Sequence, residues 1–179
     1  MNHQLKEIVQ KRAVKHGQFT LSSGLTSNHY IDLKEILHDG YGLNLIASQI
    51  YGLLGHPHKI DSIGGMEIGA IYIATAVSYE SEWATDSPIR SFTIRKESKD
   101  HDSQKRIEGF CNGNVIIVDD VVTTGNSIIQ SIEEARKVGA KVVGAFSIVD
   151  RLMGAKDAIE ALGVPYLPLL TVADLELTS

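Results

Sequence analysis

The feature of this sequence that most restricts its fold is an alternation, from residue 61 onward, of short apolar runs with segments of helical periodicity. The runs are rich in β-branched residues, which is typical of buried strands. Strands that alternate with helices across short turns are typical of a parallel sheet covered by helices. We therefore predict an α/β fold, with strands at 61–65, 88–95, 114–118, 141–149 and 166–170 and helices at 70–79, 127–138 and 155–162.

The N-terminal part has a different pattern. Apolar residues follow helical spacing at its start, which predicts a helix that ends at Gly17 and buries Leu5, Ile8, Val9 and Ala13. Residues 17–36 alternate apolar and polar side chains around two turn signals and predict a hairpin. Residues 41–54 predict a further helix, and the polar residues 96–109 predict a long loop.

We find no internal repeat and no flexible linker, so one domain over residues 1–179 is expected, with an N-terminal part at 1–38 and an α/β core at 39–179. The chain has 17 Lys and Arg against 22 Asp and Glu. The resulting net charge of −5 argues against a general nucleic-acid-binding protein.

The cysteine content and the hydropathy restrict the cellular setting. Cys111 is the single cysteine, so no intrachain disulfide and no multi-cysteine zinc site is expected. Such a chain is typical of a reducing, cytoplasmic setting. No apolar run approaches the roughly 20 residues that cross a bilayer, and the N-terminus lacks the apolar block of a signal peptide. We therefore expect no membrane partner.

The most informative segment is residues 115–127, VIIVDDVVTTGNS. A buried strand is followed by two acids, Asp119 and Asp120, and a hydroxyl-rich turn then leads into a helix. Backbone N–H groups of such a turn and the positive end of the helix dipole favour a bound phosphate. The acids would repel that phosphate directly, but they suit sugar hydroxyls or a metal held through water. A plain strand, turn and helix cap is the alternative, and it leaves the acid pair unexplained.

This segment resembles the 5-phosphoribosyl 1-diphosphate (PRPP) binding motif of the type I phosphoribosyltransferases. The resemblance implies the fold of that family, in which helices flank a mostly parallel central sheet and a small N-terminal hood, here within residues 1–38, covers the site. It also implies that PRPP is bound by Asp119, Asp120, Val121, Val122, Thr123, Thr124, Gly125, Asn126 and Ser127.

Other segments are similar to those of orotate phosphoribosyltransferases. These are RKESKDH at 95–101 for the catalytic loop, residues 19–34 for the hood and residues 64–74 for the pyrophosphate-contacting turn and helix. Arg151 stands where the family has an arginine that pairs with the orotate carboxylate, which a planar guanidinium fits well, and Thr123 is expected beside it. The resemblance further implies PRPP binding by Arg95, Lys96, Lys99 and His101, and catalytic roles for Lys99, His101, Asp119 and Asp120.

The implied reaction transfers the 5-phosphoribosyl group from PRPP to orotate and yields orotidine 5′-monophosphate and pyrophosphate, a step of de novo UMP synthesis. The resemblance implies Mg²⁺ as cofactor, bound through PRPP near Asp119 and Asp120. It also implies a homodimer in which the catalytic loop reaches the neighbouring active site. Cys111 is not expected to act, since the reaction needs no covalent nucleophile.

The sequence departs from the family pattern at several cationic positions. Many bacterial members have Lys at the positions of Glu67 and Ser22, and Lys or Arg near Leu25, whereas short members of archaeal type resemble this chain at the first two. An inactive homologue is therefore one alternative. A phosphoribosyltransferase for another base, or a PRPP-sensing regulator without catalysis, are two more. The 95–101 segment and Arg151 favour orotate, and the acidic charge argues against a nucleic-acid-binding regulator.

Overall fold

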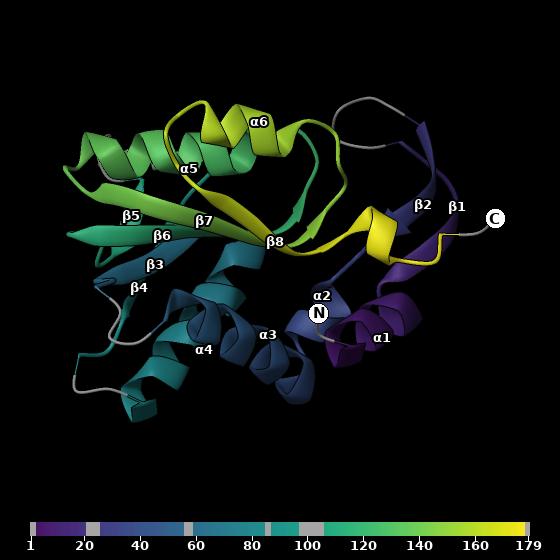
Figure 1. The fold of residues 1–179 in the computed structure, drawn as a ribbon, viewed down its shortest axis with the longest axis horizontal. Helices are drawn as coiled ribbons and strands as arrows, with labels where there is room; N and C mark the ends of the chain where they lie inside the picture. Colours follow the sequence, from purple (N-terminus) through teal and green to yellow (C-terminus); the bar gives the residue numbers. More distant parts are fainter. Residues whose placement is uncertain (1–2, 21–25, 56–58, 85–86, 97–105, 178–179) are drawn as a thin grey trace.

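The computed structural model describes residues 3–20, 26–55, 59–84, 87–96 and 106–177. A six-stranded sheet in the order β5-β4-β3-β6-β7-β8 forms the centre of the structure (Figure 1). Its strands pair in parallel except at β5, which is antiparallel to β4. The α/β prediction with a mostly parallel sheet is confirmed. The strands are β3 (Ser62–Met66), β4 (Arg90–Ile94), β5 (Ile107–Gly109), β6 (Asn114–Val122), β7 (Lys141–Asp150) and β8 (Tyr166–Thr171).

Helices cover both faces of this sheet. Helices α3 (Gly40–Leu54) and α4 (Gly69–Ala84) lie on one face, and α5 (Asn126–Lys137) and α6 (Ala155–Glu160) on the other (Figure 1). Alternate residues of β6 enter opposite cores: Ile116 packs with the α3–α4 side and Val115 with the α5–α6 side. Burial on both faces explains why the strand is continuously apolar. None of the helices in the described ranges is both long and apolar enough to cross a membrane.

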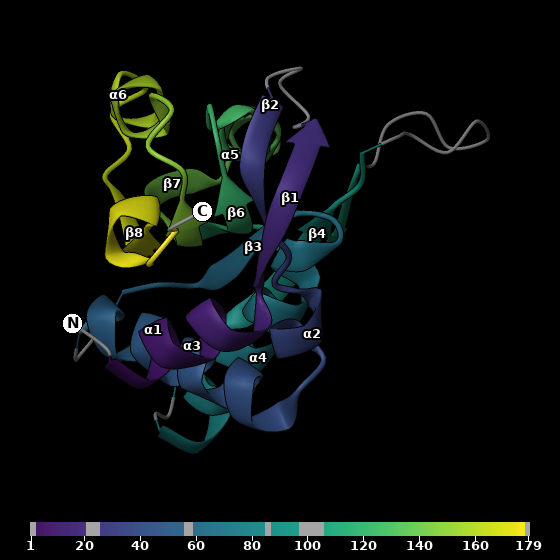
Figure 2. The same cartoon turned by 90° about the vertical axis from the view of Figure 1, so that its right-hand side faces the viewer.

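The N-terminal part folds as α1 (His3–Arg12), the antiparallel pair β1 (Val14–Thr20) and β2 (Thr26–Ile31), and a short α2 (Lys34–Leu37). Figure 2 shows the hairpin projecting from α1 and α2, apart from the central sheet. The prediction that the first helix continues to Gly17 was wrong. Residues from Val14 onward pair with β2 instead, and this pairing satisfies their backbone groups as well as a helix would.

Other boundaries differ from the prediction as well, and α4 continues to Ala84 rather than ending at 79. Strand β6 continues beyond Val118, through both acids to Val122, because its last residues pair with β7, Val122 opposite Asp150. Residues 107–109, expected within a loop, form β5 against the edge of β4. Sequence periodicity could not show either pairing. The end of β6 pairs with β7, which is remote in sequence, and β5 is itself short and polar.

Close packing in β3 supplies a test of this sheet. A Cβ atom on Gly65 would overlap the backbone carbonyl of Val118 in β6. We therefore expect Gly65→Ala to lower the free energy of unfolding by about 1–3 kcal/mol, because the strands would have to move apart. Gly52→Ala in α3, where nothing lies within 4 Å of the new Cβ, is the control and should stabilise by about 0.5–1 kcal/mol. Urea unfolding measures both, and equal stabilities would contradict the packing.

Candidate active site

A cavity of about 830 Å³ opens where β4, β6 and β7 end. Parallel α/β sheets bind ligands at the carboxyl ends of their strands, so its position agrees with the fold. Residues of the hairpin and of the segment that follows it also line the cavity. The cavity is lined by Thr20, Tyr30, Ile31, Asp32, Leu33, Lys34, Lys96, Asp119, Asp120, Val121, Val122, Thr123, Thr124, Gly125, Asn126, Ser127 and Arg151.

The structure brings most of the sequence-predicted site residues together in this cavity. Lys96, the whole segment 119–127 and Arg151 line it. Arg95 does not line it, because its Nε donates a hydrogen bond to Glu108 Oε1 at 2.6 Å. Lys99 and His101, and also Ser22 and Leu25, lie outside the described residues.

The acid pair closes the end of β6. The backbone N–H of Asp120 donates to Asp119 Oδ1 at 2.9 Å, and the N–H of Val121 donates to Asp120 Oδ1 at 2.8 Å. Asp120 also packs against the start of α4, where a Cβ on Gly69 would lie 2.5 Å from its Cγ. Burial, and secondarily the charge of Asp120, raise the pKa of Asp119 well above its ordinary value, while Lys96 acts in the opposite direction. Strongly perturbed carboxyl groups in a cavity are typical of functional sites.

The turn after the acid pair has the geometry of an anion site. Gly125 adopts φ +85°, a left-handed conformation that favours glycine, and it is the N-cap of α5. Glycine has no side chain that could cap the first N–H groups of α5. These N–H groups are therefore available at the part of the cavity that Thr123 and Ser127 line. The positive end of the α5 dipole adds to their attraction for a phosphate.

Arg151 occupies the first position after β7. Its backbone N–H donates to the Val122 carbonyl at 2.8 Å, and its Nη2 donates to the His29 carbonyl of β2 at 3.2 Å. Burial lowers the pKa of Arg151, although a guanidinium remains charged in proteins. The side chain therefore places a cation between the sheet and the hairpin, at the lining of the cavity.

The sequence of residues 19–34 resembles the hood, but no single residue of it was predicted to contact a ligand. Tyr30, Asp32 and Lys34 all line the cavity. Their position at the cavity depends on how the hairpin folds over the sheet, and no local pattern encodes that docking. The alternation of residues 26–31 was the available signal, because it predicts one strand face turned toward the protein.

Cys111 lies outside the cavity lining and packs beside the α5–α6 core. Burial raises the pKa of its thiol to about 11. A thiol with so high a pKa is almost entirely protonated at neutral pH and is a poor nucleophile. This agrees with the expectation that Cys111 takes no part in the chemistry.

The donor set at the acid pair suits a hard cation that keeps water and substrate ligands. Asp119 and Asp120 both line the cavity, and within the described ranges no cluster of three or more His, Cys, Asp or Glu side chains could hold a metal by itself. Mg²⁺ commonly binds through one or two carboxylates, and substrate phosphates and water complete its coordination. The residues present therefore fit a Mg²⁺ ion that arrives with a phosphorylated substrate.

Because the folded protein disfavours the ionised form of Asp119, this side chain should lower the stability of the ligand-free protein at high pH. When folding raises the pKa of a carboxyl group, the folded protein becomes less stable as the pH rises through that raised pKa. We expect Asp119→Asn, which keeps the acceptor for the Asp120 N–H, to raise the melting temperature of the ligand-free protein at pH 8. The gain should shrink toward pH 4, where the wild-type carboxyl is protonated. Thermal unfolding across this range checks it, and a gain independent of pH would contradict the assignment.

Comparisons with known proteins agree with this geometry. The family model described as "Phosphoribosyl transferase domain" matches residues 32–161. The orotate phosphoribosyltransferase of Pyrococcus abyssi is 41% identical over 176 residues, which cover 96% of this chain and 92% of the relative. That of Corynebacterium glutamicum (strain R) is 38% identical, covering 97% and 93%. The crystal structure of Mycobacterium tuberculosis H37Rv orotate phosphoribosyltransferase in complex with PRPP is 34% identical with a TM-score of 0.79, covering 97% and 98%.

Proposed function

The chain belongs to the phosphoribosyltransferase family, and from this premise we propose that it is an orotate phosphoribosyltransferase. One observation carries the proposal: the phosphate-binding turn, the acid pair and Arg151 line one cavity. A phosphorylated ribose requires the first two features, and a carboxylated base suits the third. Similarity to orotate phosphoribosyltransferases over nearly the whole chain supports the same conclusion.

In the proposed reaction, N1 of orotate releases its proton to water and forms a bond to C1 of the ribose while the bond from C1 to pyrophosphate breaks. The bonding electrons leave with the pyrophosphate, so negative charge develops there and positive charge on the ribose ring. Residues 123–127 hold the 5′-phosphate, and Asp119 and Asp120 face the ribose hydroxyls and the developing positive charge. Lys96, with Lys99 and His101, neutralises the leaving group, and His101 is the proposed proton donor to it.

Mg²⁺ belongs to the proposal as the ion that accompanies PRPP. Asp119 and Asp120 would hold it through water or directly, and it supplies charge neutralisation for the pyrophosphate when bound. We also propose a cytoplasmic location, in keeping with the biosynthetic reaction and with a chain that has a single cysteine.

An assay of the purified protein with a panel of bases tests the function. Orotate, uracil, xanthine, hypoxanthine and adenine are each supplied with PRPP and Mg²⁺, and the product nucleotide is measured. The proposal requires turnover with orotate well above that with any other base. Turnover with a purine, or no turnover with any base, would reject it in favour of another transferase or of a regulator.

Arg151 should discriminate between the two substrates. Loss of a charged, bidentate contact costs about 1.5–3 kcal/mol, so Arg151→Ala should raise the KM of orotate by roughly 10- to 150-fold. The KM of PRPP should change much less. Arg136→Ala is the matched control, since Arg136 is on α5 and donates to the Leu162 carbonyl away from the cavity. An unchanged KM for orotate would remove Arg151 from the base site.

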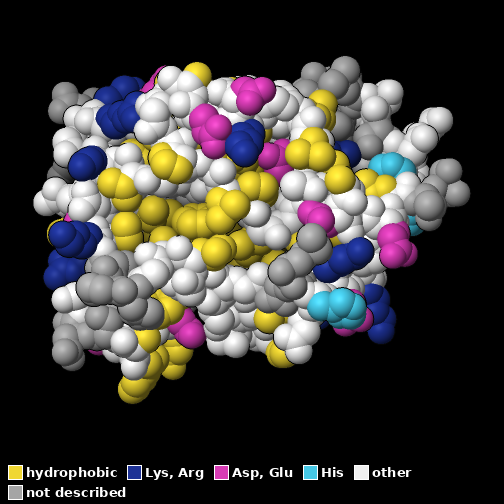
Figure 3. Space-filling view, viewed as in Figure 1, with side chains coloured by type: hydrophobic (Ala, Val, Ile, Leu, Met, Phe, Trp, Pro, Cys, Tyr) yellow, Lys and Arg dark blue, Asp and Glu magenta, His cyan; other side chains and the backbone are white. Residues whose placement is uncertain are grey.

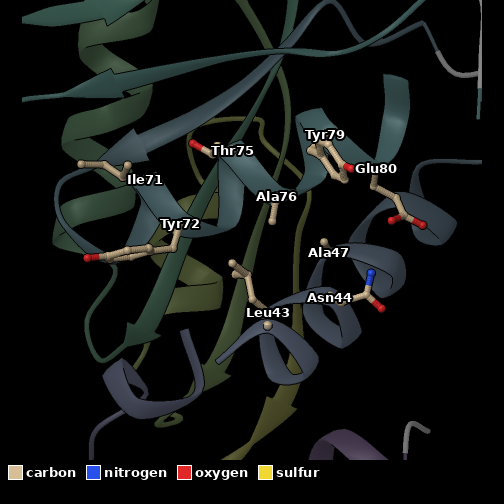
Figure 4. Close-up of a pocket in the computed structure, with 10 residues that line it drawn as sticks. Leu43, Asn44, Ala47, Ile71, Tyr72, Thr75, Ala76, Tyr79 and Glu80 are labelled. Atoms are coloured by element: carbon tan, nitrogen blue, oxygen red, sulfur yellow. The ribbon is translucent and has the colours of Figure 1, made fainter. Parts of the chain in front are cut away.

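A homodimer is part of the proposal, and the α3–α4 face is the surface we assign to the second copy. A groove of about 560 Å³ lies between these helices, with Leu43 and Ala47 of α3 opposite Ala76 of α4 (Figure 4). Tyr79 and Trp83 continue this apolar face and are 67% and 77% exposed. Hydrophobic side chains gather at this end of α4 in the space-filling view (Figure 3). Exposed aromatic side chains are enriched at protein–protein interfaces.

The dimer surface predicts the effect of a single charge. Trp83→Glu should shift the protein toward monomer by at least tenfold in dissociation constant, because it places a charge in an apolar contact. The mutated side chain is exposed, so the monomer fold should persist. Leu167→Glu on β8, also exposed, serves as control and should leave the oligomeric state unchanged. Sedimentation velocity measures both, and equal behaviour of the two variants would argue against this surface.

A further inference from the structure

The cavity contains a cation to which the assignments above give no role. Among the described residues that line it, the lysines and arginines are Lys34, Lys96 and Arg151. Lys34 is the first residue of α2 and lines the cavity together with the acid pair. We propose that Lys34 binds the pyrophosphate group of PRPP. This inference rests on the proposed function, since it deepens the description of the same site.

The charges around Lys34 leave it suited to an anionic ligand. Its Nζ lies 3.6 Å from Asp32 Oδ1, which is an ion pair longer than a hydrogen bond, and its side chain is 70% exposed. Lys15 also pairs with Asp32, and its Nζ donates to Oδ2 at 3.3 Å. One carboxylate thus faces two ammonium groups, so a net positive charge remains. Exposed ion pairs of this kind are weak, and a phosphate can readily draw the lysine away.

The backbone of Lys34 is held more firmly than its side chain. Its N–H donates to Asp32 Oδ1 at 3.2 Å, and its carbonyl accepts a hydrogen bond from His38 Nδ1 at 2.7 Å. With Nδ1 as donor, His38 Nε2 accepts from the Tyr72 hydroxyl of α4 at 2.9 Å. These contacts fix where the lysine enters the cavity, while its side chain stays flexible enough to reach a ligand.

The same contacts indicate which end of the cavity Lys34 serves. The hairpin side of the lining starts near His29, whose carbonyl is bound by Arg151 at the proposed orotate end. It ends at Lys34, which His38 and Tyr72 connect to α4. Helix α4 begins just after the turn at residues 66–69, the segment expected to contact pyrophosphate. Lys34 therefore lies toward the pyrophosphate end and away from the base.

The turn at residues 66–69 offers no cationic side chain of its own. Its charged residue is Glu67, whose Oε1 accepts a hydrogen bond from the backbone N–H of Lys96 at 3.0 Å. A pyrophosphate leaving group gains negative charge as its bond to ribose breaks, so it requires nearby cations. An ammonium group on a flexible stem provides three donors for such oxygens. Lys34 supplies positive charge that this turn lacks.

Titration calorimetry with Mg²⁺ present tests the inference on the wild type, Lys34→Ala, Lys34→Arg and the matched control Lys15→Ala. The control removes the other lysine of the same Asp32 pair, which does not line the cavity. Lys34→Ala should bind inorganic pyrophosphate and PRPP at least tenfold more weakly. Ribose 5-phosphate, which has no pyrophosphate group, should bind within twofold of wild type. Lys34→Arg should recover most of the lost affinity, and Lys15→Ala should stay within twofold for every ligand.

Several outcomes would overturn the inference. Equal weakening by Lys34→Ala and Lys15→Ala would mean that Lys34 acts only through Asp32. If Lys34→Ala weakened the binding of ribose 5-phosphate by the same factor as that of PRPP, Lys34 would act at the 5′-phosphate. If the variant raised only the KM of orotate, Lys34 would act at the base. If Lys34→Ala fails to fold, as shown by thermal unfolding, Lys34→Gln takes its place.

A wild type that shows Lys34-dependent pyrophosphate binding but no orotate turnover would reject the proposed function alone. An active enzyme with unchanged pyrophosphate affinity in Lys34→Ala would reject the inference alone.

Discussion

The rest of the structure depends on the pairing of β6 between β3 and β7 at the centre of the sheet. Both faces of β6 are buried, so its register cannot slip without moving apolar side chains out of two cores at once. That register places Val122 opposite Asp150 and so brings Arg151 beside the turn at residues 123–127. It also directs the chain into α5, whose N-terminus faces the cavity. One strand therefore positions the acid pair, the proposed anion site and the arginine proposed to bind the base together.

The acid pair has unfavourable electrostatics in the ligand-free protein. Burial disfavours the ionised form of Asp119, and the neighbouring Asp120 adds repulsion. A chain selected only for stability would place neutral residues at the end of this strand. The carboxylates are understandable if the ligand brings hydroxyl groups, a cation and a developing positive charge. Substrate binding then offsets the unfavourable electrostatics of the ligand-free protein.

The net charge of −5 and the proposed anionic substrates are compatible because the anion site depends little on net charge. Backbone N–H groups and the α5 dipole attract a phosphate regardless of the charges elsewhere on the surface. The described cations of the cavity are few, and each lies on a different element: Lys34 starts α2, Lys96 follows β4 and Arg151 follows β7. Local placement, rather than composition, decides which ligand charge this protein accepts.

The sequence by itself determined the parallel α/β core and predicted the anion site, because both depend on local patterns. The run at 115–118 can satisfy its apolar residues only in a doubly covered strand, and the order of acids, hydroxyls and glycine in 119–127 is contiguous. Only the tertiary structure decided that the first helix ends at Arg12, that Arg95 binds Glu108 and that Lys34 lines the same cavity as the acid pair. These outcomes depend on contacts between segments far apart in the chain, and a local sequence pattern does not predict the energies of such contacts.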